Sequence, residues 1–195
     1  MRAAWIAPIV LGFALAGCGD PAPAPAQPAG ASLEGDAALI ASAQAISDQI
    51  GGCTRPDDST VESKVVGLES APIVLLACSQ DKFSYTHRLF AIRAAEKPEL
   101  LSLPDYDANG MFATDQASMA ELDAGTGVLT TFRKGAEHGR CGSEARYQWD
   151  GERFDLQELH WQDCASAPES GPPFPIVWPP QQGVETDPNG ATPAP

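Results

Sequence analysis

The segment from Cys141 to Cys164 constrains the fold most, because its pattern predicts two strands joined by a turn at Asp150-Gly151. This dipeptide accepts the positive φ values of a two-residue hairpin turn. Centring the turn there separates an apolar face from a charged face. The predicted cross-strand pairs are Tyr147 with Phe154, Ala145 with Leu156, Arg146 with Asp155, and Gln148 with Arg153. The apolar positions change phase after Leu156, which predicts a β-bulge in the second strand.

Residues 1–17 have the composition of an export signal. Arg2 precedes an apolar run from Ala3 to Ala16 that is too short to cross a bilayer as a permanent helix. The run ends in Leu15-Ala16-Gly17-Cys18, which resembles the lipobox of bacterial lipoproteins. The resemblance implies that residues 1–17 are a lipoprotein signal peptide and that Cys18 receives the lipid. A secretory signal with a chance cysteine is the alternative.

Lipidation at Cys18 would anchor the chain without spanning the bilayer. Residue Gly19 stands where enteric lipoproteins of the inner membrane have an aspartate. We therefore expect a lipid-anchored protein of the bacterial cell envelope, most simply at the outer membrane and facing the periplasm. After the lipidated cysteine, residues 18–31 are rich in proline and alanine, which predicts an extended tether.

The remaining sequence predicts one β-rich globular domain over residues 32–180 and a disordered tail over residues 181–195. A helical pattern begins at Ser32 and ends at Gly51-Gly52, where two glycines favour a helix stop. The apolar residues that share one face of this predicted helix are Leu39, Ala43, Ile46 and Ile50.

Strand patterns follow the predicted helix, separated by turn-forming residues. The predicted strands cover residues 61–68, 73–78, 83–93, 100–103 and 128–132. The second is apolar at nearly every position, which predicts that both of its faces are covered. The stretch before Pro180 contains Phe174 and Trp178, and we expect it to dock on the domain. The predicted fold is mainly β (α+β), a single antiparallel-sheet domain with one N-terminal helix.

Four cysteines besides Cys18 predict two disulfides in an oxidising compartment. They are Cys53, Cys78, Cys141 and Cys164. Three connectivities are possible, and short loops favour Cys53 with Cys78 and Cys141 with Cys164. In the predicted hairpin register, however, Cys164 overshoots Cys141 by about four residues, or about 13 Å. Either the bulge and a turn close this gap, or the cysteines of the two pairs exchange partners.

The charged residues are unbalanced, with 26 acidic against 12 basic side chains and a net charge of −14. This excess repels nucleic acid and anionic lipid headgroups, so neither is an expected partner. It suits cationic proteins or metal ions. Apart from the membrane that holds its anchor, the expected partner is an envelope protein or a glycan.

From about residue 72 to residue 178 the chain resembles the C-terminal half of a bacterial exported family, domain-of-unknown-function family 1176. The matching motifs are Leu75-Leu76-Ala77-Cys78, Asp123-Ala124-Gly125, Cys141-Gly142-Ser143, Trp149-Asp150-Gly151-Glu152-Arg153-Phe154, Cys164 and Pro175-Ile176-Val177-Trp178. The sequence departs from the family pattern at Arg140, where the family tends to have aspartate, and at Phe174, which replaces a tryptophan. The resemblance implies an exported envelope protein and assigns no activity.

A calcium site is the sharpest chemical hypothesis that the motifs offer. Residues 105–110 match the first six positions of an EF-hand loop, in which alternate oxygen ligands converge on one ion. The candidate ligands are Asp105, Asp107, Asn109 and Gln116. Position twelve is Gln116 in place of the usual bidentate glutamate, and Pro104 precedes the loop. The alternative is a polar turn whose side chains bind their own backbone.

Catalytic patterns are absent from the sequence. The four cysteines are expected to be oxidised, and His87, His138 and His160 show no close spacing. We therefore expect no enzyme and no catalytic residues. Glu152, Asp155 and Glu158 lie near the hairpin, but solvated carboxylates are the ordinary case and we assign them no role.

Aromatic residues could form a recognition surface for a glycan or a peptide. The set is Tyr147, Trp149, Phe154, Trp161 and Trp178, and the candidate binding residues among them are Trp149 and Trp161. Core packing is the alternative. The first hypothesis is thus a non-enzymatic lipoprotein that binds an envelope component, such as an inhibitor of a cationic hydrolase like lysozyme. The others are a calcium-stabilised structural domain and an enzyme whose site the sequence does not reveal.

Overall fold

A computed structural model describes residues 29–54, 60–80, 84–93 and 97–180. The signal peptide, Cys18, most of the tether and the tail lie outside these residues. The elements, in chain order, are α1 (Ala29–Ile50), β1 (Lys64–Gly67), β2 (Pro72–Gln80), β3 (Tyr85–Ile92), β4 (Pro98–Leu100), β5 (Leu103–Asp107), β6 (Gly110–Thr114), β7 (Ala117–Ser118), β8 (Glu121–Leu122), β9 (Val128–Lys134), β10 (Gly142–Trp149), β11 (Phe154–Gln162), the 3-10 helix η2 (Cys164–Ser166) and β12 (Ile176–Trp178).

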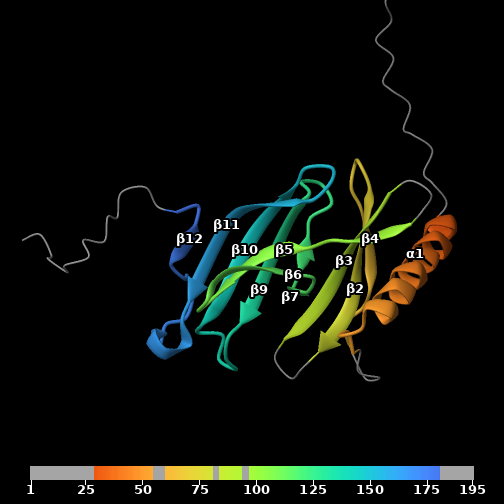
Figure 1. The fold of residues 1–195 in the computed structure, drawn as a ribbon. Coiled ribbons are helices and arrows are strands. Elements are labelled where there is room, and N and C mark those ends of the chain that lie inside the picture. Colours follow the sequence, from red (N-terminus) through yellow and green to blue (C-terminus); the bar gives the residue numbers. More distant parts are fainter. Residues whose placement is uncertain (1–28, 55–59, 81–83, 94–96, 181–195) are drawn as a thin grey trace, which may run out of the picture.

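The strands form antiparallel sheets, which confirms the mainly-β prediction with one N-terminal helix. The first sheet has the order β1-β2-β3-β4, with β7 paired to β3, and the second has the order β12-β11-β10-β9-β8. A separate hairpin, β5-β6, contacts β10 and β11. Where one sheet was expected, the described chain has two sheets and this hairpin. Figure 1 shows α1 against the outside of the first sheet, with the second sheet on its other side.

The core is divided by the first sheet into two apolar layers. In β2, Ile73 and Leu75 face the second sheet, where they join Tyr147 and Leu159. The alternate residues of β2 and β3 pack against Ala43 of α1. Both faces of β2 are therefore covered, as its continuous apolar pattern predicted.

The hairpin turns at the predicted place but with a longer loop. The side chain of Asp150 accepts hydrogen bonds from the backbone N–H groups of Glu152 and Arg153, at 2.7 and 2.8 Å. Four residues therefore form the loop. Phe154 pairs with Trp149, whereas the predicted partner of Phe154 was Tyr147. The predicted pairs are wrong by two residues. An even shift leaves every side chain on its predicted face.

The bulge predicted after Leu156 is confirmed. Tyr147 pairs with Leu156, but the next residue of β10, Arg146, pairs with Glu158, so Gln157 is the extra residue. The longer loop, the bulge and the turn into η2 together close the gap that the original register left open. Cys141 and Cys164 are bonded, with their Cα atoms 4.9 Å apart.

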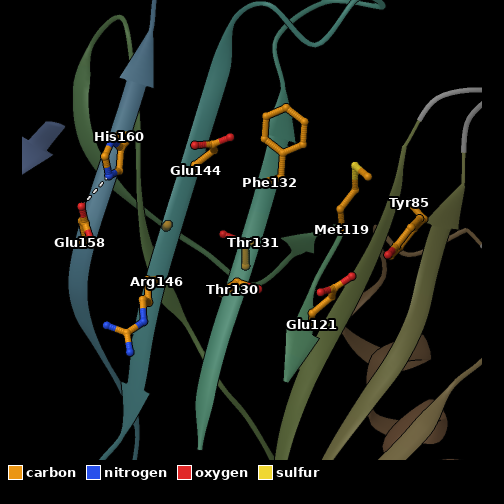
Figure 2. Close-up of a pocket in the computed structure, with 11 residues that line it drawn as sticks. Tyr85, Met119, Glu121, Thr130, Thr131, Phe132, Glu144, Arg146, Glu158 and His160 are labelled. Carbon is orange, nitrogen blue, oxygen red and sulfur yellow. Dashed lines mark hydrogen bonds and ion pairs between the residues drawn. The ribbon is translucent and has the colours of Figure 1, made fainter. Parts of the chain in front are cut away.

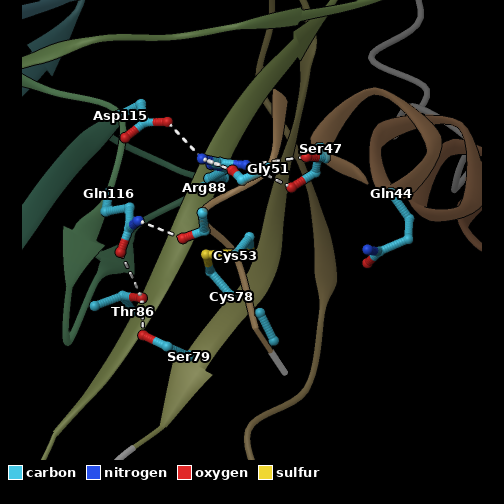
Figure 3. The surroundings of a disulfide bond; sticks show 12 residues. Gln44, Ser47, Gly51, Cys53, Cys78, Ser79, Thr86, Arg88, Asp115 and Gln116 are labelled. Carbon is cyan, nitrogen blue, oxygen red and sulfur yellow. Dashed lines mark hydrogen bonds and ion pairs between the residues drawn. A yellow bond between two sulfur atoms is a disulfide. The ribbon is translucent and has the colours of Figure 1, made fainter. Parts of the chain in front are cut away.

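The other disulfide fastens the end of α1 to the first sheet. Cys53 is bonded to Cys78, again with 4.9 Å between Cα atoms. Beside it, the buried Arg88 donates to the carbonyls of Ser47 and Gly51 and pairs with Asp115 at 2.8 Å (Figure 3). The disulfide connectivity favoured by loop length is thus confirmed.

The ends of several elements differ from the predictions. Helix α1 begins at Ala29, three residues before the expected start at Ser32. The strand expected over residues 100–103 is divided between β4, which ends at Leu100, and β5, which begins at Leu103. The segment before Pro180 docks as predicted: Phe174 is buried and β12 pairs with β11.

Candidate functional site

The outer face of the second sheet carries two rows of polar and aromatic side chains. Cross-strand pairing places Glu121, Thr130, Arg146 and Glu158 in one row. The adjacent row contains Phe132, Glu144 and His160. These residues alternate along their strands with the buried Leu129, Ala145, Tyr147 and Leu159. The alternation of a β-strand therefore gathers residues from four strands on a single surface.

Both rows line a cleft of about 400 Å³. Figure 2 shows Glu144, Arg146, Glu158 and His160 on one side, with Tyr85 and Met119 across the cleft. Tyr85 comes from the first sheet, and Met119 lies between β7 and β8. The cleft thus extends from the outer face of the second sheet to Tyr85 of the first, and its residues lie up to 75 positions apart in the sequence (Tyr85 and His160).

Met119 has a backbone conformation that is uncommon for its residue type, with φ at 46°. Its N–H donates to the carbonyl of Tyr85 at 2.9 Å, which ties the β7–β8 segment to the start of β3. A non-glycine residue in this region costs of order 1–3 kcal/mol and persists only where its surroundings impose it. The rim of the cleft is therefore held in a defined position.

His160 makes two short hydrogen-bond contacts in the cleft. Its Nδ1 lies 2.7 Å from the carbonyl of Phe174, and its Nε2 lies 2.7 Å from Oε1 of Glu158. Both partners are acceptors, so the protonated imidazolium, in which both ring nitrogens donate, satisfies both contacts. Burial lowers the pKa of His160, but these hydrogen bonds and the charges of Glu158 and Glu144 outweigh it and raise the pKa above its ordinary value.

His160 thus makes its ion-pair contact with Glu158, at 2.7 Å. Within the described part of the chain, neither Glu121 nor Glu144 takes part in a salt bridge. Both line the cleft together with the exposed Arg146. The ring of Phe132 and the side chains of Tyr85 and Met119 add apolar surface beside these carboxylates. The arrangement suits a ligand group that is positively charged at one end and apolar along its length.

The predicted calcium ligands occupy a β-hairpin. Asp105 lies in β5 and pairs with Arg133 at 2.7 Å, while the side chain of Asp107 accepts a hydrogen bond from the backbone N–H of Asn109. Gln116 lies beyond β6 and donates to the carbonyl of Gly52. In the ranges that the structure describes, no group of three or more acidic, histidine or cysteine side chains is placed to hold a metal ion. Calcium binding stays a prediction.

The predicted binding aromatics lie at opposite ends of the β10–β11 hairpin. Trp149 is largely buried, and its Nε1 donates to the hydroxyl of Ser70 at 2.7 Å. Trp161 packs against Tyr106, with 5.3 Å between ring centroids. The structure does not bring the two tryptophans together. Trp178 lies apart from the cleft and is 42% exposed.

The sequence does not reveal the cleft. Its local patterns assign no role to Glu158 and do not mark Glu121, Glu144 or Arg146 as site residues. Strand alternation places Glu144 and Arg146 on the charged face of the hairpin, which is the available signal. Their meeting with Glu158 and His160 depends on the bulge at Gln157.

The described residues contain no helix that is long and apolar enough to cross a membrane. A search of curated proteins and a search of solved structures find no match to the chain. A model of a family of proteins of unknown function, DUF1176, matches residues 19–181, well beyond the segment whose motifs resembled it. The chain therefore belongs to the DUF1176 family of proteins of unknown function.

Proposed function

We propose that this protein is a lipid-anchored binding module of the bacterial cell envelope, and that its cleft receives a basic side chain of a partner protein. The observation that supports the cleft as the site is the pair of carboxylates, Glu121 and Glu144, that line it outside any salt bridge of the described chain. The proposal assigns no catalytic step to the protein.

Charge favours a basic partner protein in two ways, at long range and within the cleft. Across the whole chain, the net charge of −14 attracts cationic proteins and speeds their encounter. Within the cleft, a carboxylate beside Phe132 and Tyr85 can bind an ammonium or guanidinium group while the rings contact its aliphatic stem. The long-range charge selects the partner, and the cleft gives the complex its orientation.

The anchor is proposed from the Cys18 motif, and it would place the cleft in the periplasm. Labelling of cells with radioactive palmitate tests it. Wild type should incorporate the label and Cys18→Ala should not, and equal labelling of the two proteins would reject the anchor.

The cleft is tested with the full chain in detergent and with lysozyme as a basic probe protein. We expect Glu121→Gln/Glu144→Gln to weaken binding about tenfold at low salt, since each carboxylate contributes up to about 1 kcal/mol when partly exposed. The matched control is Glu137→Gln/Glu169→Gln, which removes the same charge at exposed positions away from the cleft. Isothermal titration calorimetry measures both dissociation constants.

The two double variants separate a site from a general charge effect. If both weaken lysozyme binding equally, net charge alone acts and the cleft is not the site. If wild type binds no lysozyme even at low salt, the proposed partner class is wrong. Succinylated lysozyme, whose lysines carry negative charges, should not bind to any of the proteins.

A further inference from the structure

A second cavity adjoins the cleft. It measures about 420 Å³ and is lined by Glu62, which precedes β1, and by Lys64 and His87 of the first sheet, among other residues. Tyr85 and Glu121 line both cavities, so they stand at the junction between them. Figure 2 shows the tyrosine ring and the carboxylate near each other at this rim of the cleft. A ligand that contacts Glu121 in the cleft can therefore continue into the second cavity.

The second cavity has its own acceptors. Glu62 is exposed and lines it together with Glu121. His87 is only 3% exposed, and its Nε2 lies 3.4 Å from the carbonyl of Glu62, which makes Nε2 the protonated nitrogen. Burial lowers the pKa of His87, which favours the neutral ring.

A neutral histidine with this tautomer has an acceptor at Nδ1. Among the described residues, Nδ1 of His87 has no hydrogen-bond partner. This nitrogen is itself inaccessible to solvent. The acceptors that a ligand can reach in the second cavity are therefore the exposed carboxylates of Glu62 and Glu121.

We infer that the ligand of the cleft is an extended segment of a basic protein that places one basic side chain in each of the two cavities. This inference rests on the proposed function and specifies the partner further. The first side chain meets Glu144, the second meets Glu62, and the segment passes over Tyr85 and Glu121. Two weak ionic contacts on one segment give a higher affinity than either contact alone.

The test uses the full chain in detergent and synthetic peptides. One peptide carries two lysines separated by a flexible glycine-serine linker, and two control peptides each have one of these lysines replaced by glutamine. The protein variants are Glu62→Gln, which changes the second cavity, and Glu144→Gln, which changes the cleft. Both residues lie at the surface or half-buried, so neither change removes a core contact.

We expect Glu62→Gln to weaken binding of the two-lysine peptide about fivefold, the upper range for a partly exposed ion pair. The same variant should change binding of the one-lysine peptides less than twofold. Glu144→Gln should weaken all three peptides. Fluorescence anisotropy of labelled peptides gives the dissociation constants.

The other outcomes distinguish this inference from the proposed function. If Glu144→Gln weakens all peptides and Glu62→Gln weakens none, the two-cavity inference is overturned and the proposed function stands. If neither variant affects any peptide, both are overturned. If spermidine binds more tightly than the two-lysine peptide and needs both glutamates, the ligand is a small polyamine and not a protein segment.

Discussion

The two sheets of this protein differ in how many of their faces are covered. The first sheet is packed on one side by α1 and on the other by the second sheet, so the middle of β2 and β3 is buried throughout. The second sheet has its inner face against the first sheet and the β5-β6 hairpin, while its outer face carries the cleft. The first sheet therefore supplies most of the buried core, whereas the second sheet leaves one polar face open to solvent.

Two phenylalanine-to-alanine substitutions, one on each sheet, should differ strongly in how much they lower the free energy of unfolding. Phe90 is fully buried between the first sheet and α1. Phe90→Ala should lower the free energy of unfolding by about 4 kcal/mol, because it removes a large side chain and leaves a cavity. Phe132 lies half-buried on the outer face, so Phe132→Ala should cost only about 1 kcal/mol but weaken binding of basic ligands. Urea unfolding and calorimetry measure the two quantities.

The opposite result for these two variants would contradict the difference between the two sheets. A loss of several kcal/mol on Phe132→Ala, with unchanged ligand binding, would make the outer face of the second sheet a structural surface. Phe132 also lies 6.1 Å from Phe174, measured between ring centroids, so a moderate loss of stability agrees with its place in the fold.

Each sheet also carries a histidine with a shifted pKa, so the stability of the protein should depend on pH, by a smaller amount. The pKa of His160, on the second sheet, is raised, so its stabilising contribution is complete below about pH 6.5 and is lost as pH rises through the folded-state pKa. The pKa of His87, on the first sheet, is lowered, so the folded state resists protonation and stability falls as pH drops below about 6.5. As pH falls, the two histidines therefore change the stability of the folded state in opposite directions.

Denaturant unfolding of variants between pH 5 and pH 8 separates these contributions. The stability difference between wild type and His160→Gln should shrink as pH rises, whereas His87→Gln should remove part of the acid sensitivity of wild type. A stability difference between wild type and His160→Gln that stays constant with pH would mean that His160 titrates alike in the folded and unfolded chains.

Local patterns predicted much of the first sheet and the position of the hairpin. The apolar run from Ile73 identifies a strand that is covered on both faces, and Asp150-Gly151 identifies a turn. The length of the loop could not be predicted from the dipeptide, because it depends on the side chain of Asp150 bonding two backbone N–H groups. The even shift preserved the faces, so the core was predicted better than the pairing.

The cleft could not be predicted because it depends on contacts between distant residues. Glu121, Glu144 and Glu158 each look like solvated carboxylates in their local sequence. They come together only because β8, β9, β10 and β11 lie in that spatial order. Tyr85 and Met119 enter from outside this sheet, through a hydrogen bond that joins the β7–β8 segment to β3. Sequence periodicity gives the face of a residue but not its neighbours on other strands.

The bulge at Gln157 determines which side chains of β11 face the core and which face the cleft. A strand alternates with a period of two, so one residue added or removed exchanges the faces of everything that follows. Because Gln157 is bulged out of the pairing, Leu159 points into the core and both Glu158 and His160 point into the cleft. If Gln157 were paired in regular alternation instead, the leucine would face solvent and the two titratable side chains would face the core. Position 157 can therefore tolerate many different side chains, but the bulge there is what lets a stable interior and a charged cleft share one strand.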